Sequence, residues 1–285
     1  MIMVAGATGH LGSAVVNQLL AAGAKGRFLA LARDTGKAQS LVSRGVETRF
    51  ADYDRPETLA AAFAGVDTLL FISTMSMNRR EQQFGVVDAA VAAGVKHIVY
   101  TGLAIRDIAT SGVRDLMASH FETEAHIRSK GIAHTFLRNT MYAEALPTII
   151  GPQALEKGIF LPAGSGHVPY ALRSEMGEAA ANVLLQEGHR NKTYDIAGVD
   201  AHGYDDVARG LSVLTGKRLA YRDIPAQALR ETMQAAGLPE FPIYLTLGTL
   251  ADIKADQYAI GRSDLELLLG RKPKSLNDML KLVFA

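Results

Sequence analysis

The chain has 285 residues, of which 48% are hydrophobic, enough for one large α/β domain with a smaller lobe. Its 30 Lys and Arg and 29 Asp and Glu leave a net charge of +1, which argues against a nucleic-acid-binding or membrane-surface protein. With no cysteine, disulfides, thiolate nucleophiles and cysteine-ligated metals are excluded. No apolar run has the length of a membrane span, and residue 1 already belongs to the first predicted strand. We therefore expect a cytoplasmic protein.

The first predicted element is a glycine-rich turn between a strand and a helix. Residues 1–5 form an apolar run typical of a buried strand, and apolar residues recur at helical period through residues 11–20. Between them stands the spacing G-x-x-G-x-x-G. Glycines in this context allow a tight turn and close approach to a pyrophosphate, which the helix N-terminus attracts. The sequence therefore predicts a dinucleotide site, with a tight turn without a ligand as the alternative. Its candidate residues are Gly6, Thr8, Gly9, His10, Leu11 and Gly12.

Strands and helices then alternate regularly. Strands are predicted at 28–32, 46–51, 67–72, 97–101 and 132–137, with helices at about 37–44, 57–63, 80–93 and 116–130. Asp54, two residues before Pro56, is predicted to cap the helix that runs through Phe63. Such alternation indicates a doubly wound parallel sheet, the Rossmann α/β class, whose ligands lie beyond the carboxyl ends of the strands.

The pattern changes in the second half of the chain. Residues 141–170 are rich in Pro and Gly and leave the sheet, whereas 175–185 read as a helix and 192–197 as a returning edge strand. The remainder reads as mostly helical, with Ser263 and Ser275 opening capping boxes, and its helices are predicted at about 204–214, 226–236, 263–269 and 275–283. We thus expect a dinucleotide-binding domain of residues 1–140, to which 171–199 return. The substrate-binding lobe would hold 141–170 and 200–285.

The residues after the second and third strands bear on the choice of cofactor. Arg33 and Asp34 stand where a dinucleotide-binding fold meets the adenosine ribose. An acid there binds the 2′-hydroxyl of NAD, whereas Arg accommodates the 2′-phosphate of NADP. We favour Arg33 facing the cofactor and Asp34 turning away, hence NADPH with NADH still possible; a surface ion pair is the alternative. Asp52 would meet the adenine or simply cap a turn.

Candidate acids and bases are few. Many short-chain dehydrogenases pair a Tyr with a Lys four residues later, and none of the nine tyrosines here has that neighbour. The helix that normally bears such a pair holds His120 and Glu124 instead, four residues apart on one face. His120 would orient the nicotinamide ribose or donate a proton, or merely pair with Glu124. No third ligand suggests a metal site.

Several segments together resemble the NmrA-like atypical short-chain dehydrogenases, and among them the bacterial NADPH-dependent quinone reductases and triphenylmethane dye reductases. The resemblance covers nearly the whole chain. It is carried by residues 6–12, Ala51-Asp52-Tyr53, Phe71-Ile72-Ser73, residues 94–101, Thr123-Glu124 and Thr135-Phe136-Leu137-Arg138-Asn139.

This resemblance implies NADPH lying across the strand ends. Ser73, Thr74 and Thr101 would lie along the ribose side, Asn139, Thr140 and Tyr142 near the nicotinamide, and Arg173 at a further cofactor-side position. Tyr142 joins His120 as a candidate catalytic residue. Met75, Met77, Met141, Tyr142 and Phe160 would offer a soft apolar face to a flat conjugated substrate, although each is equally expected as ordinary core.

The missing Tyr-Lys pair agrees with such an acceptor, because a conjugated π-system delocalises the incoming electrons and needs no strong general acid. The leading hypothesis is therefore an NADPH-dependent reductase of quinones or similar conjugated acceptors, with a homodimer as one possible assembly. A redox sensor that binds NADP(H) and signals to a protein partner without turnover is the competing hypothesis.

Overall fold

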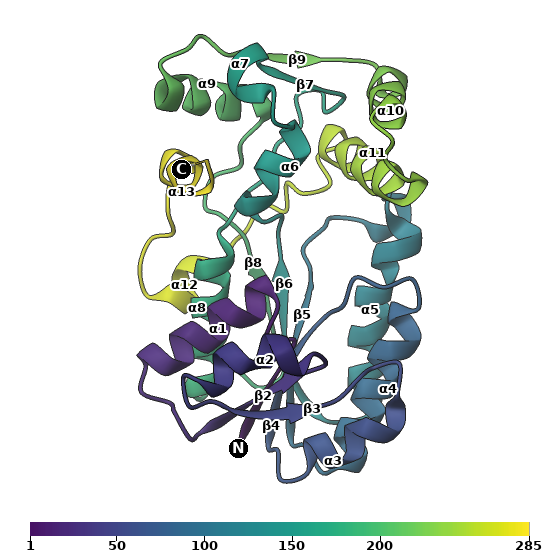
Figure 1. Cartoon of the computed structure of the whole chain (residues 1–285), viewed down its shortest axis with the longest axis vertical. Helices are drawn as coiled ribbons and strands as arrows, with labels where there is room; N and C mark the ends of the chain where they lie inside the picture. The colour runs from purple at the N-terminus through teal and green to yellow at the C-terminus, as the bar shows by residue number, and fades with distance from the viewer. Residues whose placement is uncertain (285) are drawn as a thin grey trace.

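The computed structural model describes residues 1–284, and of Thr35 the backbone alone. Seven strands form one sheet in the order β3-β2-β1-β4-β5-β6-β8, paired in parallel throughout. The predicted doubly wound sheet is thus confirmed, with β8 at one edge as expected and β3 at the other (Figure 1). Its strands are β1 Ile2–Ala5, β2 Phe28–Ala32, β3 Glu47–Phe50, β4 Thr68–Ile72, β5 His97–Leu103, β6 Ala133–Asn139 and β8 Lys192–Ile196.

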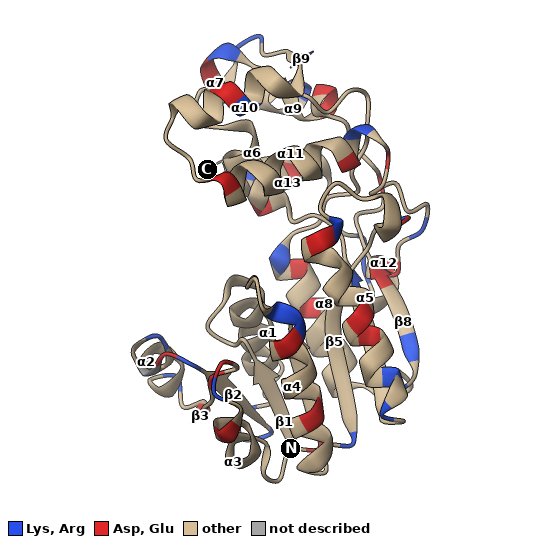
Figure 2. Cartoon of the chain, turned by 90° about the vertical axis from the view of Figure 1, so that its right-hand side faces the viewer, with Lys and Arg blue, Asp and Glu red and all other residues tan. Residues whose placement is uncertain are grey.

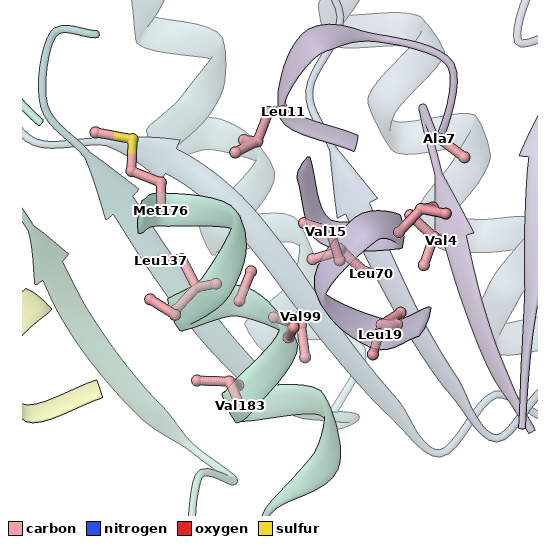
Figure 3. Close-up of a cluster of buried hydrophobic side chains, with 14 of the residues drawn as sticks. Val4, Ala7, Leu11, Val15, Leu19, Leu70, Val99, Leu137, Met176 and Val183 are labelled. Carbon is pink, nitrogen blue, oxygen red and sulfur yellow. The ribbon is translucent and has the colours of Figure 1, made fainter. Parts of the chain in front are cut away.

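Helices cover both faces of this sheet. On one face α1 (His10–Ala21), α2 (Thr35–Val42), α8 (Arg173–Leu185) and α12 (Leu265–Leu269) bury their apolar side chains against the strands. Figure 3 shows α1 and α8 facing each other over β1, β4, β5 and β6. Their backbones approach closely because Gly177 presents no side chain: a Cβ there would lie 2.6 Å from the Cβ of Ala14.

The opposite face carries α3 (Leu59–Phe63), α4 (Arg79–Ala92) and α5 (Arg114–Ser129). Helices α4 and α5 lie side by side there (Figure 2). Burial on both faces explains why β1, β2 and β4 read as continuous apolar runs rather than alternating ones.

The second lobe sits beyond the carboxyl ends of the strands (Figure 1). It has its own apolar cluster, which includes Leu146, Leu211, Leu250 and Met279, and a two-stranded parallel sheet of β7 (Ile159–Leu161) and β9 (Tyr221–Asp223). Its helices are α6 Leu146–Ile150, α7 Ala154–Lys157, α9 Tyr204–Thr215, α10 Ala226–Ala235, α11 Glu240–Lys254 and α13 Leu276–Val283.

Three local expectations need correction, and one is confirmed. Helix α11 was not predicted, because Pro242 and Gly248 lie within it and Ile243, Leu245 and Leu247 alternate like a strand. Asp54 does not cap a helix, since its carboxylate accepts hydrogen bonds from Asn78 and Gln82. Ser263 donates to the carbonyl of Ala197 and forms no capping box with Glu266. Ser275 caps α13 as predicted, by accepting from the Asp278 amide.

Among residues 1–284, no helix combines the length and the apolar character needed to cross a membrane.

Candidate functional site

A cavity of about 1030 Å³ lies at the carboxyl edge of the sheet, between the strand ends and the second lobe. One wall comes from the start of α1 and the ends of β4, β5 and β6, and the other comes from α6, α11 and Tyr258. The cavity therefore joins the glycine turn to the second lobe. The predicted site residues in its lining are Thr8, His10, Ser73, Thr74, Met75, Thr101, His120, Asn139, Thr140, Met141, Tyr142 and Arg173.

The glycine turn has the geometry of an anion cradle. Gly6 has φ +77°, a left-handed conformation that favours glycine, and a Cβ on Gly12 would lie 2.1 Å from the Gly6 carbonyl oxygen. The turn can fold this tightly only because both residues lack side chains. Gly9 is the N-cap of α1 and supplies no side-chain acceptor, so the first amides of the helix remain available to a phosphate. Leu11 is buried in the core.

Beyond β2, Arg33 and Asp34 take different roles. The Asp34 carboxylate caps α2 by accepting from the amides of Gly36, at 2.8 Å, and Lys37, at 3.1 Å. Arg33 is exposed, and within residues 1–284 no carboxylate lies within salt-bridge distance of it. Asp52 accepts from the Asp54 amide, as a turn-capping Asp does. None of the three lines the cavity.

The segment after β4 is tied to its neighbours by hydroxyl groups. The Ser73 amide donates to Thr101 Oγ1 at 3.3 Å, and Thr74 Oγ1 donates to Gln82 Oε1 at 3.0 Å. Ser73, Thr74 and Thr101 all line the cavity at the carboxyl ends of β4 and β5.

His120 is held in a buried polar chain. Its Nε2 lies 2.9 Å from Nη2 of Arg79, and its Nδ1 lies 3.0 Å from the Tyr100 hydroxyl, which donates to Gln83 Oε1 at 2.6 Å. Since arginine only donates, Nε2 must accept, and Nδ1 carries the proton. Burial first, and the Arg79 charge second, hold the pKa of His120 well below its ordinary value. The imidazole is thus neutral at neutral pH.

The alternative in which His120 pairs with Glu124 is wrong. Glu124 is buried and receives two hydrogen bonds from Arg138, at 2.9 and 2.6 Å, with Arg128 at 3.6 Å. A bidentate partner from β6 satisfies the carboxylate better than a neutral ring on its own helix. His120 and Glu124 share α5 but belong to separate networks.

Tyr142 lies beneath a cation at the end of β6. The guanidinium of Arg173 stands 4.3 Å from the centre of its ring, and Nη1 of Arg173 lies 3.7 Å from Glu144 Oε2. Burial raises the pKa of the Tyr142 hydroxyl, although the Arg173 charge opposes the shift. A phenol with a raised pKa is a weaker acid. The neighbouring Thr140 Oγ1 is buried, finds no partner among residues 1–284, and so offers a hydroxyl at the cavity wall.

Of the five predicted substrate contacts, three line the cavity and two lie outside its lining. Met75, Met141 and Tyr142 line the cavity. Met77 lies in the loop before α4, is 81% exposed, and does not line the cavity. Phe160 lies on β7 of the second lobe, outside the cavity lining, with the Arg222 guanidinium 5.9 Å from its ring centre.

Several residues of the cavity wall were missed by sequence reasoning. The most polar is Arg79, which the sequence places only as an ordinary charged residue next to the start of a helix. Three of the others, Leu245, Thr246 and Thr249, come from the unpredicted helix α11. The missed lining residues include Arg79, Met117, Ile149, Leu245, Thr246, Thr249 and Tyr258.

Comparison with known proteins now places the chain. Residues 1–280 match the NmrA-like family. The chain belongs to this family. Quinone oxidoreductase 2 of Escherichia coli K12 is 36% identical over 258 residues, covering 90% of this chain and 86% of the relative. The NAD(P)H azoreductase of Xenophilus azovorans is 32% identical over 267 residues, covering 93% of this chain and 88% of the relative.

Solved structures of this NmrA-like fold are similar over the full length. Citrobacter sp. triphenylmethane reductase, complexed with NADP(H), superposes with a TM-score of 0.90 at 37% identity, over 99% of each chain. The NADPH-dependent quinone oxidoreductase of Escherichia coli, complexed with NADPH, gives a TM-score of 0.89 at 33% identity, over 100% of each chain.

Proposed function

We propose that this protein is an NADPH-dependent reductase that transfers hydride to quinones or similar conjugated acceptors. The observation that carries the proposal is the continuity of one cavity. It runs from the amides at the start of α1 to a wall that includes Met75, Met117 and Met141. A phosphate-binding turn and a soft, polarisable surface thus share one space, as a dinucleotide-dependent reductase of flat acceptors requires.

The residues present fit NADPH. The Gly6–Gly12 turn excludes side chains where a pyrophosphate would approach. Arg33, which has no carboxylate within salt-bridge distance among residues 1–284, would face a 2′-phosphate. Asn139, Thr140 and Tyr142 would lie on the nicotinamide side. When bound, NADPH supplies the hydride. The related structures with NADPH and NADP(H) support this cofactor, and NADH remains a weaker possibility for the same site.

The chain's own residues then have to orient the reactants rather than supply protons. His120 is unprotonated, and its one N–H is directed at the Tyr100 hydroxyl. Tyr142 holds its proton tightly. Both are therefore proposed as positioning groups, and the proton that completes the reduction would come from water. The three related reductases, by name, act on quinones, azo compounds and triphenylmethane dyes, which all present conjugated acceptors.

A panel of neutral quinones and cationic dyes, incubated with NADPH and followed at the nicotinamide absorbance, tests this function. We expect oxidation of NADPH with at least one quinone, and a lower KM for NADPH than for NADH. NADPH binding without turnover on every acceptor would instead support the redox-sensor alternative.

We also propose that the division of labour is the one drawn from the sequence, with residues 1–140 and 171–199 binding the cofactor and 141–170 and 200–285 enclosing the substrate. A cytoplasmic location and a homodimer belong to the same proposal. Size-exclusion chromatography with light scattering would test the dimer directly.

A further inference from the structure

We propose that Arg79 sets the acceptor preference of the cavity: it favours acceptors that gain negative charge on oxygen when reduced, such as quinones, over cationic dyes. This inference rests on the proposed reductase function and names a substrate contact within it.

Arg79 is a buried cation at the cavity wall. Only 3% of its surface is exposed, although it is the first residue of α4. Its Nη2 donates to His120 Nε2 at 2.9 Å, while Nη1 faces only the sulfur atoms of Met117, at 3.5 Å, and Met75, at 3.8 Å. Its Nε has no partner within residues 1–284. A guanidinium with five N–H groups thus has one strong acceptor.

The part of the chain that the structure describes supplies no negative charge to balance this cation. Among residues 1–284, no carboxylate lies within 4.0 Å of Arg79. The comparably buried Glu124 and Glu175, in contrast, face Arg138 and Arg271 at 2.6 and 2.8 Å. Burial of an unpaired charge is costly, and the dipole at the start of a helix adds to the cost of a cation there. A ligand in the cavity is the remaining source of a compensating charge.

The described groups around Arg79 carry no charge, so its positive charge remains available to a negatively charged ligand in the cavity. His120 accepts one N–H and presents no charge of its own, and the two methionine sulfurs are weak acceptors. The other groups packed around this part of the wall, Tyr100 and Gln83, are neutral and hydrogen-bonded to one another. No described carboxylate within salt-bridge distance cancels the charge of Arg79, and the burial of its side chain weakens the screening of that charge by solvent.

The chemistry of the two acceptor classes differs at this point. A neutral quinone takes a hydride, with its two electrons, and becomes a hydroquinone monoanion; NADPH becomes NADP⁺, and the monoanion then takes a proton from water. Negative charge therefore develops on a quinone oxygen, where a fixed guanidinium stabilises it. A cationic triphenylmethane dye takes the same hydride and becomes neutral, so it gains nothing from Arg79 and is repelled before reduction.

The decisive variant is Arg79→Met, which removes the charge and keeps an unbranched side chain beside the two methionines. For a neutral quinone we expect kcat/KM to fall about 10- to 150-fold, the range for loss of a hydrogen bond to a charged group. For a cationic dye we expect kcat/KM to stay constant or rise. Arg80→Met is the matched control, because it removes the same charge from the next residue, which is exposed and paired with Glu122. It should leave the ratio of the two acceptors unchanged.

Binding gives an independent readout. In calorimetric titrations with saturating NADP⁺, which has no hydride to donate, Arg79→Met should weaken binding of an anionic hydroxynaphthoquinone and not that of the cationic dye. Equal loss for both ligands, or no loss for either, would overturn the inference. If the methionine variant does not fold, Arg79→Gln provides the same comparison. A parent protein that reduces no acceptor would overturn the proposed function. The binding comparison would still test whether Arg79 favours an anionic ligand over a cationic one.

Discussion

The two ends of the cavity are built in different ways. At the end near the glycine turn, the functional groups are backbone amides, and their arrangement follows from residues within a single strand-turn-helix unit. At the other end, Arg79 of α4 and His120 of α5 line the cavity, with Tyr100 of β5 buried behind His120, and the three meet only through tertiary packing. The first end offers a phosphate backbone amides, which every chain possesses, while the second offers an acceptor a particular set of buried side chains.

Because the two ends differ in construction, cofactor binding and acceptor chemistry should respond to different kinds of substitution. Cofactor binding depends on the space that missing side chains leave, so adding atoms should destroy it. Acceptor chemistry depends on a few buried polar side chains, so removing atoms should alter it while the fold survives. Substitutions at one end should therefore change cofactor binding, and substitutions at the other should change acceptor preference, each without affecting the other property.

The largest effect is expected for Gly12→Ala. Its Cβ would lie 2.1 Å from the Gly6 carbonyl oxygen and 2.8 Å from Ala7 Cα, both backbone atoms, so the turn itself must move. We expect a loss of about 3 kcal/mol in the free energy of unfolding and loss of measurable NADPH binding. Urea unfolding and calorimetry would measure both.

Gly85→Ala is the control for that substitution. Gly85 lies within α4, and a methyl group at this position would meet open space, so alanine there should stabilise the helix by about 0.5 to 1 kcal/mol. If Gly12→Ala behaved like Gly85→Ala, the turn would not be the tight cradle described.

Arg33→Ala should have the next largest effect, on the cofactor preference. Loss of a charge-assisted contact to a phosphate should weaken NADPH binding by about 10- to 150-fold, with NADH nearly unaffected. Equal weakening of both cofactors would show that Arg33 does not contact the 2′-phosphate.

Asp34→Ala supplies the matched control at the neighbouring residue. Its carboxylate accepts from two amides of α2, so its removal should lower the free energy of unfolding by about 1 kcal/mol. The ratio of the NADPH and NADH affinities should stay the same. Tighter NADH binding by the parent protein would transfer the ribose contact to Asp34.

His120→Gln should change the rate less than either substitution at the cofactor end. Glutamine still offers a donor and an acceptor, so we expect kcat with a quinone to fall less than about 10-fold and the pH profile to keep its shape. A general acid would instead show a fall of roughly 10²- to 10⁴-fold. Loss of a pH step on substitution would contradict the positioning role.

The same residue gives the smallest expected effect, on the pH dependence of stability. The pKa of His120 is lowered in the folded protein, so below about pH 6.5 the unfolded chain binds more protons than the folded one. The stability due to neutral His120 is therefore present above pH 6.5 and lost as pH falls. Between pH 6.5 and 5.5, the parent should lose up to about 1 kcal/mol more than His120→Gln. Equal slopes in urea unfolding would contradict this.

The tight glycine turn between β1 and α1 could be predicted from the sequence because its signals are local. These signals all come from the first 33 residues: the glycine spacing, the apolar run of β1 and Arg33 after β2. The structure places them in one strand-turn-helix-strand segment. The parallel sheet and its edge strands were predictable for the same reason, since strand and helix periodicity is read over short windows.

The acceptor end could not be predicted to the same depth. Whether Arg79 is buried depends on α4 and α5 packing together, and the sequence separation of 41 residues between Arg79 and His120 hides their contact. Helical spacing suggested His120 as a possible partner of Glu124, because it gives no information about Arg138 on β6. Helix α11, which closes the cavity, carries prolines and an alternating pattern that favour other structures.

We propose above all that NADPH and a quinone bind together in one cavity and that hydride passes between them there. An anaerobic reaction with limiting NADPH and one neutral quinone tests it most directly, with nicotinamide absorbance and hydroquinone measured together. We expect each NADPH oxidised to yield one hydroquinone, and Arg79→Met to slow the reaction while Arg80→Met does not. NADPH that binds but stays reduced in the presence of every quinone would contradict it.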